Sequence, residues 1–183
     1  MTSFDQLSIA ELKALVRTIP DYPQTGIQFR DITTLLLHGG GFATVIERLA
    51  ASVPGKPDLI AAIEARGFAI GAAMAMRLGC GLLLIRKDGK LPGETIAEDY
   101  ALEYGRDRLT MHVDACTPGA RVLIVDDLLA TGGTALAAAR LVCRAGGEIV
   151  GARFVIDLPT LGGAAALRAA GIEIRALMEF DGD

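Results

Sequence analysis

Two adjacent carboxylates, Asp126 and Asp127, stand between an aliphatic run and a loop of small residues. Residues 122–125 read Val-Leu-Ile-Val, and residues 128–134 read Leu-Leu-Ala-Thr-Gly-Gly-Thr ahead of an alanine-rich stretch. This order predicts a buried strand, a turn and a helix, which places the carboxylates at the carboxyl end of the strand, where open parallel sheets bind ligands. The backbone N–H groups of the turn and the N-terminus of the helix would form a phosphate site.

Carboxylates beside a phosphate site favour a ligand that carries both a phosphate and a vicinal diol. An ionised carboxylate only accepts hydrogen bonds, so each aspartate can bind one hydroxyl group of a ribose 5-phosphate. A triphosphate-binding P-loop is excluded, because the G-x-x-x-x-G-K-S/T spacing and its lysine are absent. The alternative is a tight turn with a solvated aspartate pair. The predicted contacts of the ribose 5-phosphate are Asp126, Asp127, Leu129, Ala130, Thr131, Gly132, Gly133 and Thr134.

Cations follow two other predicted strands. Arg66, in the Glu-Ala-Arg-Gly turn of residues 64–67, is placed to bind an anion where a helix begins. Arg86, Lys87 and Lys90 lie where the next strand runs into a polar insertion. Cations on such an insertion can close over an anionic leaving group and exclude water, although a solvated run of charges is the usual meaning of such a cluster.

The segment of residues 122–134 resembles the signature with which type I phosphoribosyltransferases bind phosphoribosyl pyrophosphate (PRPP). The resemblance implies that the aspartates bind the ribose hydroxyls and that the loop after them binds the 5-phosphate. It also implies a pyrophosphate site, made of Ala65, Arg66, Gly67, Arg86, Lys87 and Lys90.

Three more segments narrow the resemblance to the adenine phosphoribosyltransferases, over residues 19–156. They read Gly-Ile-Gln-Phe-Arg-Asp-Ile from residue 26, Ile-Arg-Lys-Asp-Gly-Lys-Leu-Pro-Gly from residue 85, and Leu-Glu-Tyr-Gly from residue 102. In that family the first segment is part of a hood over the base. The resemblance therefore implies that Phe29 packs on the adenine face, while the backbone around Gln28 and Arg30 reads the ring edge.

The same resemblance implies which residues take part in the reaction. Glu103 hydrogen-bonds or protonates N7 of the base, and Tyr104 lies next to it over the ribose. Arg66 is the second residue with an implied catalytic role. The implied substrates are adenine and PRPP, and the implied cofactor is Mg²⁺, held by PRPP and water with no direct protein ligand. A homodimer is implied as well.

Composition and charge limit the partners. The net charge of −4 offers no bulk attraction for nucleic acid or an anionic membrane, and no stretch reaches the length of a membrane span, so we expect a cytoplasmic protein. The three widely spaced cysteines match neither a disulfide framework nor a metal site. A phosphoribosyltransferase for hypoxanthine, xanthine or orotate is one alternative, and a non-enzymatic PRPP-sensing regulator is another.

The elements that must position these residues alternate between strands and helices. Hydrophobic residues are 51% and aromatic residues 5% of the 183 residues, a profile that packs helices closely on a buried parallel sheet. The alternation predicts an α/β fold with helices on both faces of a central parallel sheet, and the resemblance implies the type I phosphoribosyltransferase fold. The expected strands are residues 59–64, 81–87, 121–127, 149–156 and 172–180, and the expected helices are residues 8–19, 67–78, 134–144, 161–170 and one that follows residues 39–41.

We expect a single domain over residues 1–183. Residues 1–35 hold the first helix and the hood over the base, and residues 88–118 form a flexible insertion. Within the insertion, extended runs at residues 95–103 and 108–113 flank a turn at 104–107, which predicts a β-hairpin lid.

Overall fold

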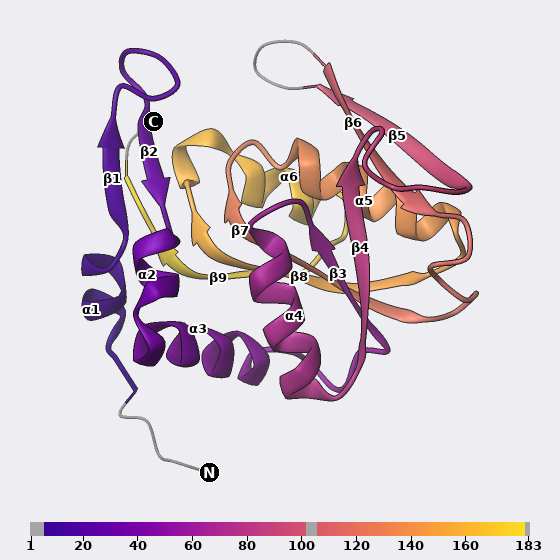
Figure 1. Ribbon diagram of the computed structural model, residues 1–183, viewed down its shortest axis with the longest axis horizontal. Coiled ribbons are helices and arrows are strands. Elements are labelled where there is room, and N and C mark those ends of the chain that lie inside the picture. The colour runs from indigo at the N-terminus through magenta and orange to yellow at the C-terminus, as the bar shows by residue number, and fades with distance from the viewer. Residues whose placement is uncertain (1–5, 102–105, 182–183) are drawn as a thin grey trace.

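The computed structural model describes residues 6–101 and 106–181 and has a seven-stranded sheet at its centre (Figure 1). The strand order is β5-β6-β4-β3-β7-β8-β9, and the run from β4 to β9 is parallel throughout. The parallel strands are β3 (Leu59–Ile63), β4 (Gly81–Lys87), β7 (Arg121–Leu129), β8 (Glu148–Asp157) and β9 (Ile174–Glu179). The predicted α/β fold with a central parallel sheet is therefore confirmed.

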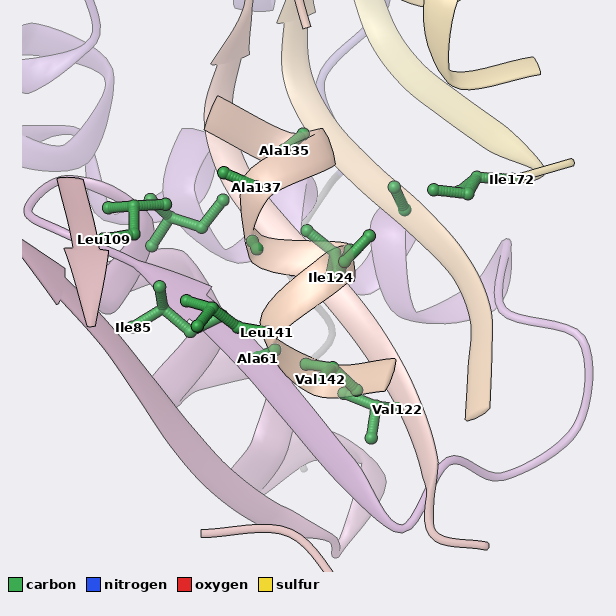
Figure 2. Close-up of a cluster of buried hydrophobic side chains, with 14 of the residues drawn as sticks. Ala61, Ile85, Leu109, Val122, Ile124, Ala135, Ala137, Leu141, Val142 and Ile172 are labelled. Carbon is green, nitrogen blue, oxygen red and sulfur yellow. The ribbon is translucent and has the colours of Figure 1, made fainter. Parts of the chain in front are cut away.

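Helices cover both faces of the sheet, because successive side chains of each buried strand point to opposite sides. On one face, Ala61, Ile85 and Ile124 of the sheet pack against Leu141 and Val142 of a helix (Figure 2). That helix is α5 (Gly133–Arg144), and α6 (Gly163–Ala169) packs beside it. The opposite face is covered by α1 (Ile9–Ala14), α3 (Gly39–Ala51) and α4 (Gly67–Leu78).

The insertion forms a hairpin, as predicted, made of β5 (Thr95–Ala101) and β6 (Arg106–His112), which extends the sheet antiparallel to β4. Residues 106 and 107 were expected in the turn but belong to β6, because they pair with residues 101 and 100 of β5. The base of the hairpin is built into the core, since Leu109 and Met111 are buried. Glu98 of the hairpin is also paired with both Arg140 and Arg144 of α5. Residues 102–105, which include Glu103 and Tyr104, lie outside the described residues.

The first helix is shorter than the expected residues 8–19. The predicted capping box forms between Ser8 and Glu11, but α1 ends at Ala14 and the chain continues into β1 (Arg17–Pro20). That strand pairs antiparallel with β2 (Gln28–Asp31), so pairing with a distant segment overrides the local helical periodicity. A short helix, α2 (Thr33–Leu37), follows.

Two other element boundaries differ from expectation. β7 extends two residues past Asp127, because Leu128 and Leu129 still pair with β8. The expected last helix is split into a 3-10 turn, η1 (Pro159–Leu161), and α6, with Gly162 between them at a φ of 76°.

Among the described residues, we find no helix that is both long and apolar enough to span a membrane.

Candidate active site

The aspartate pair lies at the carboxyl end of β7, as predicted. Asp127 is 5% exposed, and its backbone N–H donates to Asp126 Oδ1 at 2.8 Å. The chain then turns through Ala130 and Thr131 to Gly132, which is the N-cap of α5 and has a φ of 85°. A non-glycine residue is strained at that angle, so the tight approach of the loop to the helix depends on glycine.

A second helix start supports this loop from behind. The Gly163 N–H donates to the carbonyl oxygen of Ala130 at 3.0 Å. A Cβ on Gly163 would lie 2.2 Å from the same oxygen and 2.9 Å from the Gly132 nitrogen. The loop predicted to bind the 5-phosphate is therefore held against the start of α6 with no room for a side chain between them.

The two carboxylates are electrostatically unusual. Burial, and then the neighbouring carboxylate of Asp127, raise the pKa of Asp126 well above its ordinary value. Burial also raises the pKa of Asp127, although the Arg66 guanidinium opposes that shift. Asp127 Oδ2 is buried and accepts no well-aligned hydrogen bond from the described residues, although the Arg66 guanidinium lies close to it.

Arg66 connects this pair to the N-terminal strands. Its Nε forms an ion pair with Asp127 Oδ2 at 2.8 Å, at the point where β3 leads into α4. Its guanidinium carbon also lies 5.0 Å from the centre of the Phe29 ring, a cation–π contact. The edge of that ring meets Tyr22, with ring centres 5.2 Å apart. Gly67 leaves space here, because a Cβ would come within 2.7 Å of Asp126 Oδ1.

A cavity of about 460 Å³ opens above the ends of the strands. It brings together residues from β7, the loop after it, the turn after β3, the end of β4 and the hairpin. Predicted site residues among its walls are Ala65, Arg66, Lys87, Asp126, Asp127, Leu129, Ala130, Thr131, Gly132 and Thr134. Glu64, Tyr100, Asp107, Leu128, Ala135 and Phe154 also line it.

The other predicted pyrophosphate residues are placed differently. The Arg86 guanidinium pairs with Glu64 at 3.1 Å and donates to the carbonyl of Lys90 at 2.9 Å. Burial opposes ionisation of Glu64, but hydrogen bonds from Arg86 and from the backbone of Lys87 lower its pKa on balance. Gly67, Arg86 and Lys90 are not among the residues that line the cavity, and neither is Gly133, the first residue of α5.

The predicted base hood is the antiparallel pair of β1 and β2. Gln28, Phe29 and Arg30 all lie on β2, with Phe29 opposite Ile19. The Arg30 side chain donates to the Thr18 hydroxyl and to the carbonyl of Asp181, so it points toward the C-terminal segment.

Sequence reasoning missed two cavity residues on the hairpin, Tyr100 and Asp107. They face each other across β5 and β6, and the Tyr100 hydroxyl donates to Asp107 Oδ2 at 3.1 Å. Lys87 Nζ lies 3.1 Å from the same oxygen. The predicted turn at residues 104–107 included Asp107, so its pairing with Tyr100 depends on the observed register of the hairpin, and its contact with Lys87 depends on how β6 pairs with β4.

Comparisons with known proteins agree with this geometry. Residues 33–163 match the family model of the phosphoribosyl transferase domain. The adenine phosphoribosyltransferase of Sphingopyxis alaskensis is 58% identical over 174 residues, which cover 94% of this chain and 95% of that protein. That of Erythrobacter litoralis is 58% identical over 178 residues, with 96% and 99% covered. The crystal structure of adenine phosphoribosyltransferase from Thermoanaerobacter pseudethanolicus has a TM-score of 0.90 and 48% identity, covering 94% of this chain and 100% of that one.

Proposed function

This chain belongs to the phosphoribosyl transferase family and, within it, to the adenine phosphoribosyltransferases, and on that premise we propose that it transfers the 5-phosphoribosyl group of PRPP to adenine. The products are AMP and pyrophosphate, so the reaction is a step of purine salvage. In this reaction the bond between C1 of the ribose and the pyrophosphate oxygen breaks, a bond from C1 to N9 of adenine forms, and the imidazole ring of adenine loses its N–H proton.

One observation carries the proposal: a single cavity holds acceptors for a diol, donors for a phosphate and cations for a pyrophosphate. Asp126 and Asp127 supply the acceptors, and the loop that follows them supplies backbone N–H groups at the start of α5. Arg66 and Lys87, which line the same cavity, supply the cations. Phe29 lies directly behind Arg66 and gives an aromatic face for a base.

The chain acts mainly by positioning and by stabilising charge. As the C1–oxygen bond lengthens, negative charge develops on the pyrophosphate and positive charge on the ribose. Arg66 and Lys87 face the first charge, while Asp126 and Asp127 hold the ribose hydroxyls next to the second. Adenine N9 attacks from the face opposite the leaving group, with its ring on Phe29, and Glu103 hydrogen-bonds N7.

We propose that Mg²⁺ enters this site bound to oxygen atoms of PRPP. Among the described residues, no group of three or more His, Cys, Asp or Glu side chains is arranged to hold a metal ion. Asp126 and Asp127, which line the cavity beside the phosphate loop, are assigned to the ribose hydroxyls. They would therefore hold the ion indirectly, through PRPP and water. When bound, Mg²⁺ neutralises charge on the pyrophosphate oxygens.

We also propose a homodimer in the cytoplasm, with residues 1–35 as the hood and residues 88–118 as the lid. Met76 of α4 and Leu82 and Leu84 of β4 support the dimer, since they are 87%, 41% and 38% exposed. These two elements also carry Arg66 at the start of α4 and Lys87 at the end of β4. Analytical ultracentrifugation of the protein and of Leu84→Asp tests the dimer, which the charged variant should weaken.

The decisive experiment is AMP formation from adenine and PRPP, with hypoxanthine, xanthine and orotate as competing bases at saturating PRPP. We expect turnover with adenine, dependence on Mg²⁺, and no comparable turnover with the oxo-bases. The hood favours adenine because backbone groups that donate to and accept from a six-amino purine present the wrong pattern to an oxo-purine. PRPP binding without turnover of any base would point to a regulator instead.

A further inference from the structure

Near the turn end of the hairpin, one carboxylate is held by hydrogen bonds on both of its oxygens. Asp107 Oδ1 accepts the backbone N–H of Arg108 at 2.8 Å, and Oδ2 accepts the Tyr100 hydroxyl at 3.1 Å. Tyr100 is itself 6% exposed, and its side chain also interacts with that of Thr134 in the first turn of α5. The carboxylate is therefore braced from the core, and its place relative to the phosphate loop is set by Tyr100.

Among the partners of the Asp107 carboxylate, Lys87 is the one with a cationic side chain in the cavity. Its ammonium nitrogen lies 3.1 Å from Asp107 Oδ2, while the Lys87 side chain is 56% exposed and lines the cavity. An ammonium group has three donors, so one bond to Asp107 leaves the others for a second anion. Because a free lysine side chain samples many rotamers, a fixed carboxylate lowers the entropy that is lost when the ammonium meets that anion.

Resting on the proposed function, we infer that Asp107 is a positioning residue, which aims the Lys87 ammonium at the pyrophosphate half of PRPP and is itself held in place by Tyr100. Asp107 acts through Lys87 and needs no contact with the substrate. Its role therefore has a selective consequence. Ligands with a pyrophosphate group should depend on Asp107, whereas AMP, which has no such group, should not.

Asp107→Asn tests this role, because it removes the charge and keeps the shape of the side chain. We expect the variant to bind magnesium pyrophosphate roughly fivefold more weakly and to bind AMP as the unchanged protein does, both by calorimetry. The KM for PRPP should rise by a similar factor while the KM for adenine stays the same. Unchanged or tighter pyrophosphate binding would overturn the inference, since tighter binding means that Asp107 competes with pyrophosphate for Lys87.

A double-mutant cycle shows whether Asp107 acts through Lys87. In a Lys87→Ala background, Asp107→Asn should have no further effect on pyrophosphate binding, and an undiminished effect there would refute the inference. Asp99→Asn is the matched control, because Asp99 lies on the same hairpin and pairs with an arginine, Arg108, at 2.6 Å, but neither of these two residues lines the cavity. The control should bind both ligands normally.

Tyr100→Phe covers the case in which Asp107→Asn does not fold. It removes only the hydroxyl that braces the carboxylate, so pyrophosphate binding should weaken in the same direction by a smaller factor, roughly twofold. Unchanged pyrophosphate binding in that variant would then decide against the inference. The proposed function fails separately, if the unchanged protein makes no AMP from adenine and PRPP.

Discussion

Arg66 Nε lies 2.8 Å from Asp127 Oδ2, so a cation assigned to pyrophosphate is paired with a carboxylate assigned to ribose before either ligand binds. The same guanidinium covers the Phe29 ring that we assign to adenine. Arg66, which is assigned to pyrophosphate, thus contacts both the carboxylate assigned to ribose and the aromatic ring assigned to adenine. When PRPP binds, we expect its pyrophosphate to replace Asp127 as the anionic partner of Arg66, and its ribose hydroxyls to replace Arg66 as the partners of Asp127.

Replacing Arg66 should therefore strongly lower the catalytic efficiency. We expect Arg66→Ala to lower kcat/KM for PRPP by about 10²–10³, because it removes a charge that faces the leaving group and leaves the buried Asp127 unpaired. Steady-state kinetics measures the effect. Arg77→Ala is the control, since Arg77 on the same helix pairs with Glu47 at the surface, and its loss should change kcat/KM by less than about twofold. A similar loss in both variants would contradict the role of Arg66.

The raised pKa of Asp126 predicts a stability cost at neutral pH. Below its ordinary pKa of 3.8, both the folded and the unfolded chain are protonated at this residue, and there is no cost. As the pH rises past that value the unfolded chain ionises first, so the free energy of unfolding falls until the raised pKa of the folded state is passed. Asp126→Asn should increase the free energy of unfolding by about 1 kcal/mol at pH 7 while it weakens PRPP binding.

Urea unfolding at two pH values checks this prediction. The gain in the free energy of unfolding from Asp126→Asn should shrink toward zero near about pH 3.5. At that pH, which is below the ordinary pKa, Asp126 of the unchanged protein is mostly protonated in the folded and in the unfolded state. A gain of the same size at both pH values would show that burial of charge is not its cause. A loss of stability at pH 7 would contradict the direction of the pKa shift.

Glu103 lies outside the described residues, so its role remains a prediction from the sequence. We expect Glu103→Gln to lower kcat by about 10²–10³ with little change in the affinity for PRPP, because the proposed contact is with the base during the reaction. Pre-steady-state kinetics with PRPP already bound separates the two effects. An unchanged turnover number would reject the assignment.

Gly163 should be a position where one methyl group damages the phosphate loop. In Gly163→Ala the new Cβ would meet the Ala130 carbonyl oxygen at 2.2 Å, so the loop must move. We expect a loss of roughly 1–3 kcal/mol in the free energy of unfolding and weaker binding of ribose 5-phosphate. Gly39 is the matched control, because it also begins a helix but has open space around it, and Gly39→Ala should leave both quantities within about 0.5 kcal/mol. Equal effects would contradict the packing argument.

The parallel sheet, and the placement of the residues that we assign to ribose 5-phosphate, could be predicted from the sequence alone. Both depend on short-range information: a buried strand is readable from a run such as Val-Leu-Ile-Val, and Asp126 to Thr134 are contiguous residues on one strand-turn-helix unit. Contiguity fixes their relative placement to within the geometry of one turn. For the same reason, the local sequence is enough to place the turn that holds Arg66 at the end of a second strand.

Contacts between residues that are far apart in the sequence could be known only from the tertiary structure. The helical spacing of residues 8–19 was real, yet residues 17–20 form a strand because β2 offers them a backbone partner. Arg86 and Lys87 looked equivalent in sequence, but neighbouring residues of a strand point to opposite sides, so Arg86 pairs with Glu64 while Lys87 reaches Asp107 and the cavity. Such contacts join segments many residues apart, and no local pattern encodes their distances. The meeting of Arg66 with Asp127 and Phe29 is of this kind, since it depends on how three elements pack.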